Sequence, residues 1–350
     1  MADTHDERRT WWDRLFPPEA KRLEVALPLL LIGILPTLVF AAANEFLNAY
    51  GTAPGYLAAP AVFDGNAEAA GRLRVLAASA ALTGASLAAL LYFLGSLRFF
   101  TRASARVVLI IYVIAATLCL LLMLGDAVRQ PQTFLGEQQT CRALNMVEAE
   151  AAGAGPRTAV KIAPAVDAKV ALPRASSPPP DQSCNGGRYL ELKNLHHFHR
   201  YALAVVTPAL VLGALSFGAA PRRGTAEEAK RRARTMNEYL YISAAVLVLG
   251  LLYLSATLRW PAHALHPLDR AAYLEHVDAL VLYWGVVYSL YIVSFYVPIA
   301  LWMGRNFGSS AVFGKGEDAA LRHPLSLIKL GTTIFAPAIA GLIGNAVATG

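Results

Sequence analysis

"VLAASAALTGASLAALLYFLGSL", residues 75–97, runs without a single charged side chain. A helix needs about 20 apolar residues to cross roughly 30 Å of hydrocarbon. Lipid offers no hydrogen-bond partner for an exposed backbone group, so a segment of this kind has to be helical inside a bilayer. Residues 75–97 therefore predict a transmembrane helix.

Runs of the same kind recur along the chain. Five others meet the same criterion, and they are 25–43, 107–125, 201–220, 239–258 and 279–304. A further stretch, 330–350, is also uncharged but is richer in Ala, Gly and Thr. The chain is 56% hydrophobic and only 16% charged, unlike a soluble domain. The predicted fold class is an all-α integral membrane protein with six transmembrane helices plus a seventh hydrophobic C-terminal helix.

Lysine and arginine predict the orientation, because cytoplasmic loops carry an excess of both. The four segments on the N-terminal side hold 18 of the 31 Lys and Arg residues, and these segments are 1–24, 98–106, 221–238 and 305–329. The sequence thus predicts a plasma or bacterial inner membrane protein with a cytoplasmic N-terminus and an interfacial aromatic patch at Trp11 and Trp12. The net charge of +7 is read as a topology signal, and nucleic-acid duplex binding is not indicated.

These assignments divide the chain into consecutive parts. Helices 1–3 occupy residues 25–125, helices 4–6 occupy 201–304, and the cytoplasmic tail with the C-terminal helix occupies 305–350. The connection 126–200 is long and faces outward in this topology.

The outer loop 126–200 contains two of the three cysteines. Oxidising compartments preserve disulfides, so Cys141 and Cys184 are predicted to be bonded and to staple the loop. Two unpaired thiols remain the alternative. The Ala- and Pro-rich insert 149–182 between them is predicted to be extended or disordered.

The segment 221–238 is the first candidate site. Thr225 with Glu228 forms a capping box, which predicts a helix that starts here and runs unbroken into 239–258. After i,i+4 pairing of its glutamates, four cations remain as candidate anion ligands, namely Arg222, Arg223, Lys230 and Arg234. Guanidinium groups beside a helix N-terminus favour anions. Contact with lipid headgroups is the ordinary alternative.

The C-terminal stretch carries small residues at every fourth position, which are Ala336, Ala340, Gly344 and Ala348, with the polar Asn345 beside them. Small residues let helix backbones approach closely in lipid. The ladder suits helix packing between subunits, a seventh span, or a helix packed against its own subunit.

Six of the eight histidines fall on the predicted outer side, namely His196, His197, His199, His263, His266 and His276. Imidazole is a common metal ligand and titrates near neutral pH. One interpretation is a metal or haem site that uses His196, His199 and His276. The other is a set of amphipathic residues at the membrane interface.

No ionisable residue lies inside the six predicted spans, which disfavours a proton-driven transporter. No nucleophile or P-loop motif is present, so no catalytic residue is assigned, an enzyme is not supported, and any cofactor is unknown. In architecture only, the chain resembles small membrane effectors of bacterial defence systems. That resemblance, with the basic segment and the C-terminal ladder, favours a homo-oligomeric channel or pore-forming effector controlled from its cytoplasmic face by an anionic, nucleotide-like ligand. The alternative is an outer-face metal- or haem-binding redox or sensor protein.

Overall fold

The computed structural model describes residues 23–50, 65–129, 187–218, 226–265, 267–307 and 331–348, which are almost entirely helical. The helices are α2 (Leu23–Tyr50), α3 (Gly65–Ser96), α4 (Arg102–Arg129), α6 (Gly187–Gly218), α7 (Ala226–Arg259), α8 (Pro267–Phe307) and α11 (Ala336–Ala348). Two short 3-10 turns, η3 (Leu97–Phe99) and η4 (Trp260–Ala264), follow α3 and α7. One helical turn, 331–334, precedes α11.

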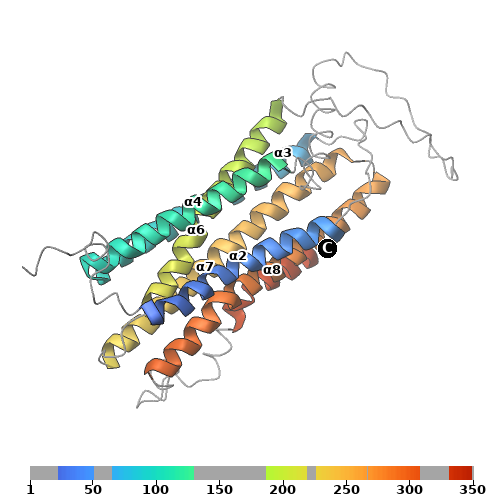
Figure 1. The fold of residues 1–350 in the computed structure, drawn as a ribbon. Helices are drawn as coiled ribbons and strands as arrows, with labels where there is room; N and C mark the ends of the chain where they lie inside the picture. Colours follow the sequence, from blue (N-terminus) through green and yellow to red (C-terminus); the bar gives the residue numbers. More distant parts are fainter. Residues whose placement is uncertain are drawn as a thin grey trace, which may run out of the picture.

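The helices form a bundle in which α7 is central (Figure 1). Helix α7 contacts α3, α6, α8 and α11, whereas α2 packs on α8 and α4 packs mainly on α6. We call the end of the bundle that holds η3 and the first turns of α7 the η3 end. The end that holds η4 and the first turns of α3 and α8 is called the η4 end.

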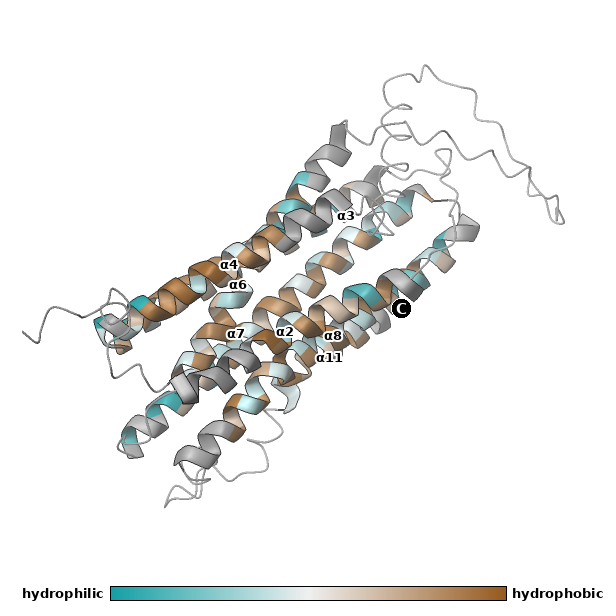
Figure 2. Ribbon diagram, viewed as in Figure 1, coloured by the Kyte–Doolittle hydropathy of each residue, from teal (hydrophilic) through white to brown (hydrophobic). Residues whose placement is uncertain are grey.

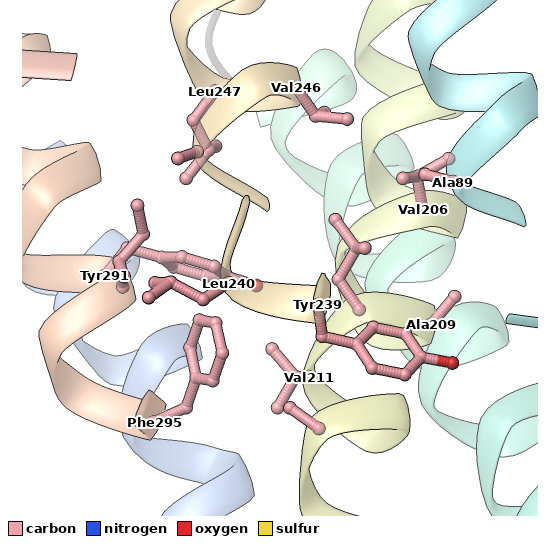
Figure 3. Packing of buried hydrophobic residues seen from close by; sticks show 14 of the residues in the cluster. Ala89, Val206, Ala209, Val211, Tyr239, Leu240, Val246, Leu247, Tyr291 and Phe295 are labelled. Atoms are coloured by element: carbon pink, nitrogen blue, oxygen red, sulfur yellow. The ribbon is translucent and has the colours of Figure 1, made fainter. Parts of the chain in front are cut away.

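The interior between α3, α6, α7 and α8 is filled by large side chains (Figure 3). Tyr239, Leu240, Ile292 and Phe295 are all completely buried there. In water, burial of each large aliphatic or aromatic side chain stabilises the folded state by about 1.5–3 kcal/mol. Where lipid surrounds the bundle, van der Waals packing between the helices stabilises it instead. A path through this interior would have to displace those side chains.

A second, smaller core joins α2 to α8 and η4. The ring centroid of Phe40 lies 5.2 Å from that of Trp284 and 6.4 Å from that of Tyr288. The Tyr283 hydroxyl donates a hydrogen bond of 2.7 Å to the carbonyl oxygen of Ala43. Tyrosine can therefore lie in this apolar contact with its hydroxyl satisfied.

Five helices are long and apolar enough to cross a membrane, and their spans are Ala69–Phe99, Ser104–Leu121, Asn194–Phe217, Arg231–His263 and Arg270–Leu301. Within α2 the described apolar part is shorter, Gly33–Leu47. Apolar residues occupy the middle of the helices and polar residues gather toward their ends (Figure 2). The span in α4 is only 6% buried inside the protein, so most of its leucines and isoleucines face outward, as they do toward lipid.

Several helices extend beyond the apolar runs predicted from the sequence, and α6 differs most at its start. Helix α6 begins at Gly187, so the last part of the predicted loop 126–200 is helical. The mixed polar sequence before Tyr201 hid this extension, because hydropathy identifies only the apolar part of a helix. The N-terminal patch at Trp11, the insert 149–182 and both loop cysteines lie outside the described residues.

Candidate functional site

The basic segment of α7 is helical and continuous with the span, as predicted. Helix α7 runs without interruption from Ala226 to Arg259, a length of about 50 Å at 1.5 Å per residue. That exceeds the hydrocarbon thickness, so part of the helix extends beyond the apolar layer. Arg222, Arg223 and the capping Thr225 lie outside the described residues, and the side chain of Lys230 is also outside them.

Two of the described arginines of this segment, Arg231 and Arg234, have partners within the protein that can be named. Arg234 Nε lies 3.2 Å from Glu238 Oε1, one helical turn away. The guanidinium carbon of Arg231 lies 5.5 Å from the centroid of the Phe99 ring in η3, a cation–π contact. The sequence prediction left Arg234 as unneutralised charge; here Glu238 neutralises it, because the helical i,i+4 spacing brings the two side chains together.

Three consecutive residues of α7 attach it to its neighbours at this level. The Tyr296 hydroxyl of α8 donates to Asn237 Oδ1 at 2.6 Å, and the Tyr92 hydroxyl of α3 donates to Glu238 Oε2. The Tyr239 hydroxyl and Ser96 Oγ of α3 are 2.6 Å apart. We call Asn237, Glu238 and Tyr239 the α7 hub.

Sequence reasoning missed the hub. A signal was available, because successive residues in a helix point about 100° apart. Three adjacent polar side chains at the border of an apolar span cannot share one face, so they have to meet different neighbours. Their partners, being distant in sequence, could not be identified from the chain alone.

Gly213 of α6 makes room for the hub tyrosine. A Cβ atom at this position would lie 2.3 Å from Cε1 and Cζ of Tyr239, far inside van der Waals contact. The ring of Tyr239, which is fully buried, therefore depends on glycine at 213 for its place between α3, α6 and α7.

His199 forms a second polar contact nearer the η4 end. Its side chain is 2% exposed, and its ring stacks on Tyr253 of α7 at a centroid distance of 4.3 Å. Nδ1 lies 2.8 Å from the carbonyl oxygen of Leu195, which can only accept, so Nδ1 carries the proton. Nε2 lies 3.2 Å from both the hydroxyl and the carbonyl oxygen of Ser79 in α3, and 3.3 Å from Thr83 Oγ1.

These contacts change the interpretation of the histidines. His199 is buried between α3, α6 and α7, whereas the sequence reading placed it at the outer edge of its span and found no histidine inside the helices. The His196 ring stacks on Tyr253 at 6.4 Å and the His197 ring on Tyr201 at 6.2 Å. Within the described ranges no group of three or more His, Cys, Asp or Glu side chains is placed to hold a metal ion. Within the described ranges, His276 is therefore not placed to bind a metal ion together with His196 and His199. The side chain of His266 lies outside the described residues.

The C-terminal helix packs against its own subunit. A Cβ at Gly285 of α8 would lie 2.7 Å from the Pro337 carbonyl oxygen, and one at Gly341 would lie 3.3 Å from Leu282 Cα. Ser289 Oγ accepts a hydrogen bond of 3.3 Å from the Ala338 amide. Helix α11 therefore packs closely on α8 of the same chain.

The two ladder residues whose side chains are described, Ala336 and Ala340, lie beside the buried positions of α11. Positions four apart rotate by about 40° per step around a helix, so a strict four-residue spacing drifts off one face. The buried positions are Pro337 and Gly341, and the side-chain environments of Gly344 and Ala348 lie outside the described residues. Ala336 and Ala340 are half-buried at the edge of this face. The side chain of Asn345 lies outside the described residues.

The structure also describes Cys119 and Asp278. Cys119 is a half-buried free thiol in α4, and the predicted Cys141–Cys184 bond falls in the part not described. Asp278 of α8 accepts a hydrogen bond from Arg259 Nη2 of α7. Comparisons of the chain with protein-family models, curated proteins and solved structures found no match.

Proposed function

We propose that the protein is a homo-oligomeric membrane channel or pore-forming effector that is controlled from its cytoplasmic face. The observation that carries the proposal is the α7 hub. The basic segment is one rigid piece with the central helix, and the hub ties that helix to α3 and α8. A ligand that acts on the basic segment therefore acts directly on the packing of the bundle.

The proposed topology has six spans, from α2, α3, α4, α6, α7 and α8, with α11 as a further hydrophobic helix. The N-terminus and the η3 end are assigned to the cytoplasm, and the η4 end faces outward. The basic segment beside the η3 end supports this assignment, since lysine and arginine are retained on the cytoplasmic side.

Control rests on competition for Arg234. Its pair with Glu238 is exposed, with 83% and 40% of the two side chains accessible, and exposed pairs contribute only about 0–1 kcal/mol. A phosphate group forms stronger, bidentate contacts with a guanidinium. An anionic ligand can therefore take Arg234 from Glu238 at little cost, and this would leave the Glu238 carboxylate supported by Tyr92 alone.

The conducting path is assigned to the space between subunits. The interior of one subunit is filled by residues such as Tyr239 and Phe295, so a path there would cost a large part of the core. Helix α4 contributes little to that core, and its outward apolar surface is available for self-association or lipid.

The test is to exchange Arg222, Arg223 and Arg234 for Lys and to measure ion flux in proteoliposomes with a set of mono- and dinucleotides. Lysine keeps the charge and the topology but cannot reproduce bidentate geometry. We expect wild type to be activated by at least one nucleotide and the triple variant to need on the order of ten- to a hundredfold more of it.

Arg106→Lys is the matched control, because Arg106 is an exposed arginine on α4, at the same end of the bundle. It should respond like wild type. Equal activation of the triple variant and wild type, or no activation of wild type by any nucleotide of the set, would remove the proposed ligand control.

A further inference from the structure

A cavity of about 180 Å³ opens at the η4 end between α3 and α7. Its lining comes from Gly71 and Arg74 of α3, from α7, and from η4, with Ser255, Arg259, Trp260 and His263 supplying the polar groups. It lies at the opposite end of α7 from the basic segment, so nothing in the proposed cytoplasmic control uses it.

The side chains of this cavity are rich in hydrogen-bond donors. Arg74 and Arg259 carry donors only. His263 Nδ1 lies 3.1 Å from Arg270 Nη2; because arginine cannot accept, Nδ1 has to be the acceptor, and the neutral ring carries its proton on Nε2. Among the described lining residues no carboxylate is present.

The cavity is also held in shape by its surroundings. Asp278 of α8 fixes the guanidinium of Arg259, which is three-quarters buried, so this cation does not have to be ordered when a ligand binds. Trp260 forms a rigid wall against Gly71, where a Cβ would lie 3.0 Å from Trp260 Cδ1. Arg74, which also lines the cavity, is exposed.

We infer that this cavity is a binding site for a phosphate-type oxyanion, held by Arg74 and Arg259 with His263 as a neutral donor. Guanidinium groups bind phosphate oxygens through charge-assisted, often bidentate hydrogen bonds. The ligand is the phosphate of a lipid headgroup or free phosphate, and the chemistry of recognition is the same for both. The site is independent of the proposed channel activity, and its test needs no conductance measurement.

Two probes separate the two sources. Inorganic phosphate is titrated into the purified protein in a neutral detergent by isothermal titration calorimetry. In parallel, native mass spectrometry counts the lipids retained after incubation with equal amounts of phosphatidylglycerol and phosphatidylcholine. Phosphate binding identifies a free oxyanion as ligand, and retained phosphatidylglycerol without phosphate binding identifies the lipid headgroup.

Arg74→Gln is the variant to compare, because Arg74 is exposed and its replacement should not disturb folding. We expect it to weaken binding of whichever probe binds by about tenfold or more. Arg259→Lys, which keeps the charge beside Asp278, should weaken binding by a similar factor.

Arg106→Gln makes the same change of charge at the η3 end and should alter binding less than twofold. The inference is overturned if neither probe binds wild type. It is equally overturned if Arg74→Gln and Arg106→Gln weaken binding to the same extent, because the effect would then be one of net charge.

Discussion

Ser79 and Ser86 lie about two turns apart on one face of α3, and both are buried. Ser79 Oγ lies 3.2 Å from Nε2 of His199, whereas Ser86 Oγ has no hydrogen-bond partner within the described part of the chain. A partnered hydroxyl contributes about 1 kcal/mol, while an unpartnered buried one costs its own desolvation.

We therefore expect Ser79→Ala to lower the free energy of unfolding by about 1 kcal/mol and Ser86→Ala to leave it unchanged or raised. Thermal unfolding of both variants in the same mild detergent measures the difference. Equal losses for the two variants would mean that the contact between Ser79 and His199 does not contribute to stability.

At the scale of single residues, the sequence indicated which residue types were unusual, but it did not indicate which residues they contact. It identified the histidines as unusual, but not that His199 would be buried against Ser79 and Tyr253. It could not pair Glu238 with Tyr92, because the two are separated by 146 positions. Such partners follow from how helices pack, which a single sequence does not encode locally.

At the scale of elements, local rules predicted α7 well. The capping pattern and the i,i+4 charges indicated a helix that enters the span unbroken, and α7 is continuous from Ala226. The same rules missed the first turns of α6, since residues 187–200 are polar enough to resemble a loop. Packing on α3 and α7, visible in the burial of His199, holds that part of the helix in place.

The contact between α8 and α11 gives a prediction about elements. Gly285→Ala would place a Cβ 2.7 Å from the Pro337 carbonyl oxygen, and backbone cannot yield as a flexible side chain does. We expect a loss of about 1–3 kcal/mol in unfolding free energy from this overpacking, measured by thermal unfolding in detergent.

Gly84→Ala is the matched control for Gly285→Ala, because a Cβ at Gly84 of α3 meets no other atom within 4 Å. It should be neutral or slightly stabilising, since alanine favours helix more than glycine does. If both variants behaved alike, α11 would not be packed against α8 through this glycine.

At the scale of the whole molecule, the apolar runs in the sequence predicted a helical membrane protein, and five helices have the length and composition to cross a bilayer. The sequence could not show which helix is central. Helix α7 is not the most apolar of them, because its first turns are charged, yet it contacts most of the others. Its central place links the basic segment to the core in the proposed mechanism.

The pair between Arg234 and Glu238 is the point at which the proposed control can be tested most directly. Glu238→Gln removes the carboxylate charge that pairs with Arg234. The variant should therefore release Arg234 from this pair without any ligand, as the ligand does in the proposed mechanism. The measurement is the conductance of purified protein in planar bilayers without nucleotide. The account predicts closed wild-type protein and spontaneous openings of the Glu238→Gln variant, with Glu227→Gln, an exposed glutamate at the start of α7, as a closed control. A Glu238→Gln protein that inserts and assembles like wild type but stays closed would contradict it.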